Sequence, residues 1–432
     1  MTLDAEVIVV GGGPAGTATA WGLARAGVDV LVVDRARFPR DKPCAEYLSP
    51  QASRILSDMG VLATVEAAGA ARLTGMTIRA PSGVAFRGDF AAAHGFRGFR
   101  NEGLSLRRLV LDAILLRHAE AAGARVLEGS MVTDVTRDVT GRVTGVRLGA
   151  GSEAQSADGT GATDGNSSRT LSARVVVGAD GLRSVISRRT GLAHSRRWPK
   201  RMAFVTHYRD VAGIGTTGEM HVERDGYVGL ADVGSGHTTV ALVVPVSAAR
   251  GVGADRSGYL DAWIARHPQL APRFRGASRI SPVRATGPFA QHALHRWSPG
   301  VALVGDAADF FDPFTGEGVY TALRGGELLT PYLYEAVRGT SAGAADAALA
   351  AYDRCWRHEF RGKQIVERAV GAAVAMPAVI GHVARVLRRR PDMADLLIGV
   401  TGDFIPASEV LRAGYLGRLA LPAFLHRAAG QR

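Results

Sequence analysis

Near its start the chain contains Ala5-Glu-Val-Ile-Val-Val-Gly-Gly-Gly-Pro-Ala-Gly16, an apolar run that leads directly into a glycine-rich turn. The pattern predicts a buried strand over Val7–Val10, a turn over Gly11–Gly16, a helix over Thr17–Ala26 and a second strand over Val28–Val33. A strand, a glycine turn, a helix and a parallel strand form the first part of a dinucleotide-binding unit. The stretch therefore predicts an α/β protein with a Rossmann-like domain.

The turn has the spacing G-x-G-x-x-G at Gly11, Gly13 and Gly16. The first glycine permits the tight turn, the second lets the backbone approach a pyrophosphate, and the third lets the helix pack close to the strand. The helix N-terminus then faces the negative charge. We therefore expect Gly11, Gly13, Pro14, Ala15 and Gly16 to bind a dinucleotide. A glycine turn without function is the alternative, but the surrounding strands and helix all agree with binding.

Asp34 closes the second predicted strand, with 17 residues between it and Gly16. A carboxylate at that position accepts hydrogen bonds from both ribose hydroxyls and repels a 2′-phosphate. The motif alone does not distinguish NAD from FAD. A NAD domain completes its sheet by further strand–helix alternation, whereas here a β-rich segment intervenes and two more nucleotide-type signatures follow far downstream.

Length and composition exclude several classes of protein. The 432 residues correspond to roughly two to three ordinary domains, and 47% hydrophobic against 21% charged residues is a globular composition, not that of a disordered chain. The apolar stretch Ala369–Gly381 is interrupted by Pro377 and is shorter than the roughly 20 residues of a spanning helix. No secretory signal precedes the first strand, and Cys44 and Cys355 are too few for a disulfide framework or a cysteine-rich metal site. We expect a cytoplasmic protein without a transmembrane segment.

The net charge is +12, and all of the 52 basic residues except Lys42, Lys200 and Lys363 are arginine. Arginine is scattered through the chain, but residues 183–201 hold a cluster of seven basic residues and no acidic one. A solvated basic face is one interpretation. The other is a landing surface for a phosphorylated cofactor, an acidic carrier or a protein partner. No nucleic-acid-binding motif accompanies the cluster, so we expect no nucleic-acid partner.

Further along, Leu104–Ala122 has helical periodicity, and residues 202–299 are mostly strand-like apart from a helix near Ser257–Arg266. Gly149–Ser168 is a low-complexity insert that we expect to be a disordered hairpin tip. From Gly316 the chain is helical almost to its end. The alternation predicts an FAD- or NAD-type Rossmann-like domain interleaved with a β-sheet substrate domain. The expected boundaries are 1–70, 101–195 and 296–335 for the first domain, 71–100 and 196–295 for the second, and 336–432 for a C-terminal helical region.

Two downstream signatures, Val177-Gly-Ala-Asp-Gly-Leu-Arg-Ser184 and Val304-Gly-Asp-Ala-Ala308 with Asp312-Pro-Phe-Thr-Gly-Glu-Gly318, resemble those of flavoprotein monooxygenases and geranylgeranyl reductases. Flavin-dependent halogenases share that overall plan. The resemblance covers residues 5–335, and the loop Phe38–Cys44 followed by Leu48-Ser-Pro50 is most similar to the geranylgeranyl reductase branch. It implies that the dinucleotide is FAD, with NAD(P)H as a transient reductant or a separate reductase in its place.

The resemblance also implies roles for individual residues. Asp34 and Arg35 would lie at the adenosine ribose, Val132 at the adenine, and Arg108 at the phosphates and ribityl chain. Arg108 and Asp112 are one helical turn apart, so a simple salt bridge is the alternative. The remaining implied FAD-site residues are Cys44 and Ala45 in the loop, Asp180 and Gly181, Gly305 and Asp306, and Pro313, Gly316 and Gly318. Cys44 is also a candidate catalytic residue, with a packed side chain as the alternative.

The sequence departs from these families in its substrate sheet. Prenyl reductases carry Tyr-x-Trp-x-Phe-Pro, whereas Gly226–Asp232 keeps only the tyrosine, and the halogenase tryptophan element is absent. The leading expectation is therefore an NAD(P)H- and O₂-dependent monooxygenase that hydroxylates a small apolar aromatic or polyketide-type substrate through a flavin C4a-hydroperoxide. The alternative is a flavin-dependent reductase of a prenyl-type C=C bond. A second alternative is a flavoprotein acting on a carrier- or protein-bound partner, with a helical tail that touches an anionic membrane or an acidic carrier. The competing interpretation of the tail is a helical lid that closes the substrate cavity.

Overall fold

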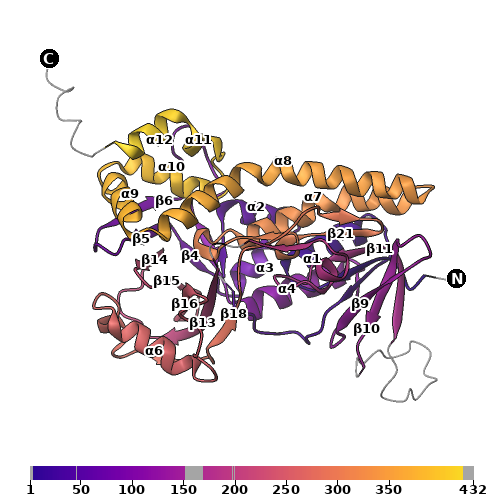
Figure 1. The fold of residues 1–432 in the computed structure, drawn as a ribbon, viewed down its shortest axis with the longest axis horizontal. Coiled ribbons are helices and arrows are strands. Elements are labelled where there is room, and N and C mark those ends of the chain that lie inside the picture. Colours follow the sequence, from indigo (N-terminus) through magenta and orange to yellow (C-terminus); the bar gives the residue numbers. More distant parts are fainter. Residues whose placement is uncertain (1–2, 45, 151–168, 197, 199, 422–432) are drawn as a thin grey trace.

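The computed structural model describes residues 3–44, 46–150, 169–196, 198 and 200–421. Ala45, the tail beyond 421 and nearly all of the low-complexity insert, residues 151–168, lie outside the described residues. Two large sheets and a C-terminal group of helices make up the molecule (Figure 1). The α/β fold class with a Rossmann-like sheet is confirmed.

The first sheet carries the dinucleotide-binding unit. Its path is β20 (Trp297–Ser298), β21 (Val301–Leu303), β11 (Thr170–Gly178), β1 (Ala5–Val10), β2 (Val30–Val33) and β8 (Arg125–Leu127). The strands from β21 to β8 are parallel, whereas the hairpin β9 (Val132–Arg137) and β10 (Val143–Leu148) pairs antiparallel with the first part of β11. Strands buried on both faces are near-continuous Val and Ile, as β1 and β2 are.

Helix α1 (Pro14–Arg25) follows β1 and packs against α4 (Arg108–Ala121) and α7 (Gly318–Arg338). It begins three residues earlier than expected, because Pro14 suits the first turn of a helix, where its missing N–H is not needed. The expected helix over Leu104–Ala122 is wrong at its start. Leu104 belongs to β7 (Gly103–Ser105), where it pairs with Leu48 of β3 (Tyr47–Leu48). This pairing is non-local, so periodicity within the segment did not reveal it.

The second sheet lies beside the first and is mostly antiparallel. Its path is β17 (Ser278–Arg279), β13 (Arg201–Arg209), β16 (His237–Pro245), β15 (Gly226–Asp232), β14 (Thr217–Glu223), β5 (Gly75–Arg79) and β6 (Ala85–Asp89), with β18 (Arg284–Thr286) also on β13. The smaller sheets are β3–β7–β4, where β4 is Ala71–Leu73, and β12 (Ala193–Ser195), β19 (Gln291–Ala293) and β22 (Asp309–Phe310).

The helical C-terminal region is seen as α8 (Ala342–Val374), α9 (Pro377–Arg389), α10 (Pro391–Thr401), α11 (Ser408–Leu411) and α12 (Ala413–Ala420). Helix α8 runs along the molecule above α7, and α9 and α10 cover β6 (Figure 1). The remaining helices are α2 (Pro50–Asp58), α3 (Leu62–Ala67), α5 (Val185–Arg189) and α6 (Arg256–Arg266). Within the described ranges no single helix has the length and composition to cross a membrane; only α8 and α9 together, bent by 111°, meet that criterion.

Candidate functional site

One cavity runs from the glycine turn after β1 to the inner face of the second sheet, under α8. The elements around it come from distant parts of the sequence and meet only in the fold. Of the residues expected to bind FAD, those that line this cavity are Gly13, Pro14, Ala15, Cys44, Arg108, Gly181, Asp306, Pro313, Gly316 and Gly318.

The glycines of the turn have different surroundings. A Cβ at Gly16 would lie 1.9 Å from the carbonyl oxygen of Gly11, and one at Gly11, where φ is +109°, would lie 2.4 Å from that of Ala179. Both glycines are therefore required by the packing of the turn itself. A Cβ at Gly13 would meet only the guanidinium ends of Arg40 and Arg108, at 3.7 and 3.8 Å. Gly13 thus leaves its backbone open toward two cationic groups.

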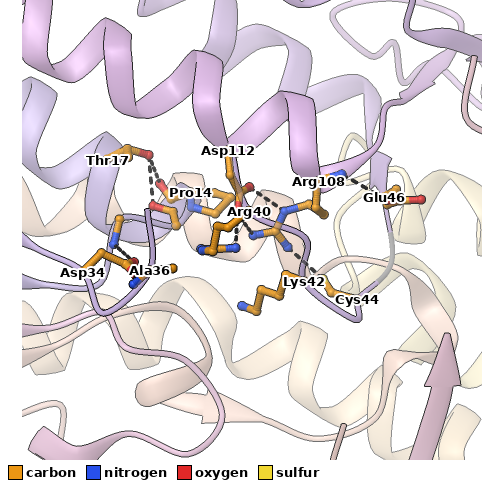
Figure 2. A network of polar contacts seen from close by, with 12 residues as sticks. Pro14, Thr17, Asp34, Ala36, Arg40, Lys42, Cys44, Glu46, Arg108 and Asp112 are labelled. Carbon is orange, nitrogen blue, oxygen red and sulfur yellow. Dashed lines mark hydrogen bonds and ion pairs between the residues drawn. The ribbon is translucent and has the colours of Figure 1, made fainter. Parts of the chain in front are cut away.

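Arg108 is held in place by a buried carboxylate (Figure 2). Its Nε and Nη2 donate to the two oxygens of Asp112 at 2.6 and 2.8 Å, and Nη1 of Arg40 lies 2.9 Å from Asp112 Oδ2. Burial lowers the pKa of Arg108, but the charge and hydrogen bonds of Asp112 together with the charges of Cys44 and Asp306 outweigh it, and the net shift is upward. The salt bridge and a functional position are therefore compatible, because Asp112 orients a guanidinium that still faces the cavity.

The loop after the second strand adds two groups to the same wall. Nη1 of Arg108 donates to Cys44 Sγ at 2.8 Å, and Lys42 Nζ lies 3.8 Å from Asp306 Oδ2 across the cavity. Figure 2 shows Lys42, Cys44 and Arg108 together beside the glycine turn. Cys44 therefore lies at the expected place, next to a cation; a catalytic role for it stays a prediction.

Asp34 supports the glycine turn directly. Its Oδ2 accepts the Gly12 N–H and its Oδ1 accepts the Ala36 N–H, both at 2.8 Å. Each oxygen keeps a lone pair for a ribose hydroxyl. Asp34 does not line the cavity, nor do Arg35, which is exposed, and Val132, which is buried in the core around the first sheet. Their adenosine-side roles stay predictions.

Asp180 acts mainly on its own loop. Its Oδ2 accepts the Val185 N–H at 2.6 Å at the start of α5, and its Oδ1 is buried without a hydrogen-bond partner among the described residues. Burial raises its pKa. Its neighbour Gly181, with φ of +78°, lines the cavity. A Cβ at this position would lie 3.6 Å from Lys42 Nζ. Gly305 packs instead against Ala15 and does not line the cavity.

The turn before α7 is fixed from the second sheet. Asp312 accepts three hydrogen bonds: from the Phe314 N–H at 3.1 Å, from Arg201 Nη1 at 2.8 Å and from the Tyr227 hydroxyl at 2.6 Å. Gly316 takes a left-handed conformation, φ +73°, and a Cβ there would lie 3.1 Å from the Tyr47 ring. The Pro313–Gly318 turn is thereby held against the cavity.

The burial of Arg201 contradicts the interpretation of the whole basic cluster, residues 183–201, as a solvated face. It is only 6% exposed and is paired with Asp312, so it is no part of a solvated face. Arg183 and Arg188 are exposed and donate to the backbone carbonyls of Gly287 and Ser184. The partner expected at this cluster stays a prediction.

Sequence reasoning missed Arg40, Asp112, Asp312 and Tyr227 as site residues. Asp112 was visible only as a helical neighbour of Arg108, and Asp312 only as the first letter of a motif. Arg40 lay within the loop Phe38–Cys44 and Tyr227 was the tyrosine kept from the reductase motif, but neither motif revealed the partner distant in sequence that gives each its role.

The substrate side of the cavity is apolar. It is lined by Leu73, Met76, Met220, Phe289, Phe310 and Phe314. Gly229 and Ala231 of β15 also face it, at the part of the chain where the prenyl reductase motif would carry larger side chains. The missing side chains therefore leave room in this wall.

The residues present fit FAD. The guanidinium ends of Arg40 and Arg108 lie beside the open backbone of Gly13 at the start of α1, and Lys42 lines the same cavity. Cationic donors next to a helix N-terminus suit a pyrophosphate. The second helix start, at Gly318 of α7, borders the same cavity next to its apolar part. A long dinucleotide can therefore reach from the first sheet to the substrate side.

Comparison with known proteins agrees with an FAD site. The chain matches the FAD binding domain family over residues 4–369. Menaquinone reductase of Mycolicibacterium smegmatis is 28% identical over 421 residues, which cover 94% of this chain and 93% of that protein. Digeranylgeranylglycerophospholipid reductase 2 of Methanopyrus kandleri is 28% identical over 410 residues, which cover 93% of this chain and 94% of that protein.

The structure of the flavin-dependent brominase Bmp2 has the same fold, with a TM-score of 0.78 at 23% identity over 96% of this chain and 97% of that one. Cavity, cationic cradle and glycine turn all lie inside the matched range 4–369. This chain therefore belongs to the FAD-binding-domain family of flavoproteins and is an FAD-dependent oxidoreductase.

Proposed function

We propose that the protein is a flavin-dependent reductase that saturates a carbon–carbon double bond in an apolar, isoprenoid-type substrate. The observation that carries this proposal is the apolar chamber that directly adjoins the Pro313–Gly318 turn. Gly229 and Ala231 widen that chamber toward the sheet. The two relatives that match this chain almost from end to end are both named as reductases of such lipids, which supports the reductase over the hydroxylase expected from the sequence.

FAD, when bound, supplies the hydride for the double bond. The chain's own part is to bind and orient. Arg40, Lys42 and Arg108 would hold the pyrophosphate and ribityl region, and Asp312 fixes the turn that lies along the substrate side. The apolar walls exclude water from the bond to be reduced. Electrons would come from NAD(P)H that binds transiently, or from a separate reductase.

The test compares turnover with and without oxygen. Purified protein loaded with FAD is given a reductant and prenylated quinones, prenyl lipids or phenols, and products are identified by mass spectrometry. The reductase predicts a product two hydrogens heavier in strict anaerobiosis. Incorporation of ¹⁸O from ¹⁸O₂, with no anaerobic product, would instead establish the hydroxylase.

A further inference from the structure

A compact group of ionisable side chains lies in the cavity wall opposite the glycine turn. Glu317 immediately precedes α7, Lys363 and Glu367 are one turn apart on α8, and Asp403 follows α10. Lys363 Nζ lies 3.2 Å from Glu317 Oε2 and also contacts Asp403. The carboxyl groups of Glu317 and Glu367 lie near enough to each other for each to influence the ionisation of the other. The fold thus brings three carboxyl groups together around one lysine.

Burial disfavours the full ionisation of this group. Two carboxyl groups that are buried beside each other resist carrying two negative charges, so one of them tends to keep its hydrogen. Burial raises the pKa of Glu367 well above its ordinary value, and the charges of Glu317 and Asp309 raise it further, while Lys363 opposes them. Burial also raises the pKa of Glu317, although Lys363 lowers it. Since Lys363 lies against Glu317 and Asp403, the proton belongs on Glu367.

The carboxyl pair lines the cavity. Glu317, Lys363, Gln364 and Glu367 all line the cavity. Glu367 lies deep inside the protein but remains partly accessible, and the surface that it leaves open faces the cavity. Its proton is therefore within reach of a molecule bound there.

A second, independent feature marks the same corner as a ligand site. The Tyr47 side chain lines the cavity and is only 8% exposed, yet its hydroxyl has no hydrogen-bond partner within the described part of the chain. Burial raises its pKa, and the nearby Glu317 charge raises it further, so the hydroxyl keeps its hydrogen. A buried O–H without a partner is costly, and a bound molecule with a polar atom would remove that cost.

We propose that the Glu317–Glu367 carboxyl pair is the proton donor of the reaction, an inference that rests on the proposed reductase function. Reduction of a double bond needs one hydride and one proton. The hydride from reduced FAD forms a C–H bond at one carbon, the electron pair of the π bond moves to the other carbon, and that carbon takes the proton from Glu367. The O–H bond of Glu367 breaks, its carboxylate is reprotonated from solvent, and the cofactor is left as oxidised FAD.

The decisive variant is Glu367→Gln. Glutamine is nearly the same size as glutamic acid and is neutral like the protonated acid, so it preserves the cavity wall but has no acidic proton. We expect the anaerobic oxidation of pre-reduced enzyme by its isoprenoid substrate to slow about 10²- to 10⁴-fold, the usual contribution of a general acid. Reduction of the flavin by dithionite should be unchanged. The matched control is Glu359→Gln, on the same helix and paired with Arg324 at 2.8 Å, which should keep the wild-type rate.

Infrared spectroscopy gives a readout without turnover. Apo-protein at neutral pH should show the C=O stretch of a buried protonated carboxylic acid that shifts in D₂O, and Glu367→Gln should lose it while Glu359→Gln keeps it. If this band is present in Glu367→Gln, the assignment of the proton to Glu367 is overturned.

The pH profile separates a proton donor from a structural residue. The rate should fall as pH rises through the pKa of Glu367. In Glu317→Gln one repelling charge is gone while Asp309, Lys363, Asp403 and Tyr47 remain, so the fall should move to lower pH. An unmoved profile, or wild-type rates in Glu367→Gln, would overturn the inference while leaving the reductase intact. Failure of the wild-type enzyme to reduce any double bond would overturn the reductase and, with it, this role.

Discussion

The guanidinium of Arg201 and the carboxylate of Asp312 form a buried ion pair, 2.8 Å between Nη1 and Oδ2, that ties the second sheet to the turn before α7. Tyr227 of β15 donates to the other oxygen of Asp312 at 2.6 Å. Strands β13 and β15 of the second sheet thus hold the Pro313–Gly318 turn against the cavity.

Replacing Arg201 with methionine should be strongly destabilising, because Asp312 would remain buried without its cation. We expect a loss of about 3–5 kcal/mol in the free energy of unfolding, measured by denaturant titration. Arg266→Met is the control, since its pair with Asp225 at 3.1 Å is exposed and should contribute at most about 1 kcal/mol. Equal losses in the two variants would mean that the buried pair does not hold the turn.

Gly13→Val and Gly16→Val should fail in different ways. At Gly13 the added Cβ would be in ordinary contact with the guanidinium ends of Arg40 and Arg108, at 3.7 and 3.8 Å, so the protein should fold but no longer retain FAD. At Gly16 it collides with the Gly11 carbonyl 1.9 Å away, so folding itself should suffer. Flavin absorbance measures how much FAD each purified protein retains, and circular dichroism measures whether each protein is folded. A folded Gly13→Val protein with full flavin occupancy would contradict the pyrophosphate assignment.

Asp306→Ala should weaken FAD binding and leave the fold intact. The side chain lies at the cavity wall, and its contact with Lys42 is long, 3.8 Å, and partly exposed, so the protein loses little when it is removed. Its expected partner is the ribityl and phosphate portion of FAD. We would measure the dissociation constant by fluorescence titration alongside the melting temperature. Wild-type affinity would show that the downstream signature does not contact the cofactor.

Acid should weaken the second sheet through Glu219. Burial opposes ionisation there, but hydrogen bonds from His221 and Arg273 outweigh it and lower the pKa from 4.5 to about 2. A depressed pKa stabilises the fold above pH 4.5, and that stabilisation disappears as pH falls toward 2. At pH 7, Glu219→Gln should cost about 2 kcal/mol after allowing for partial solvent screening.

The same measurement at lower pH tests the cause. The difference in free energy of unfolding between wild type and Glu219→Gln should shrink steadily below pH 4.5. A difference that stays constant to pH 2 would assign the loss to packing and not to charge.

The α/β class and the place of the FAD-binding turn followed from the sequence alone, because their determinants are local. A buried strand, three spaced glycines and an acidic residue after the second strand occupy one short stretch, and each has a fixed geometric reason. The downstream motifs could be recognised for the same reason, since Asp306 and the Pro313–Gly318 turn lie within one short stretch of the sequence.

Only the tertiary structure decided which side chains cooperate. The strand at Leu104 exists because Leu48 pairs with it, and Arg40 and Arg108 share Asp112 across separate segments. The proton on Glu367 depends on Glu317, which is 50 residues away in sequence, and on how deeply both are buried. Burial and long-range pairing are properties of the folded chain, and no local pattern encodes them.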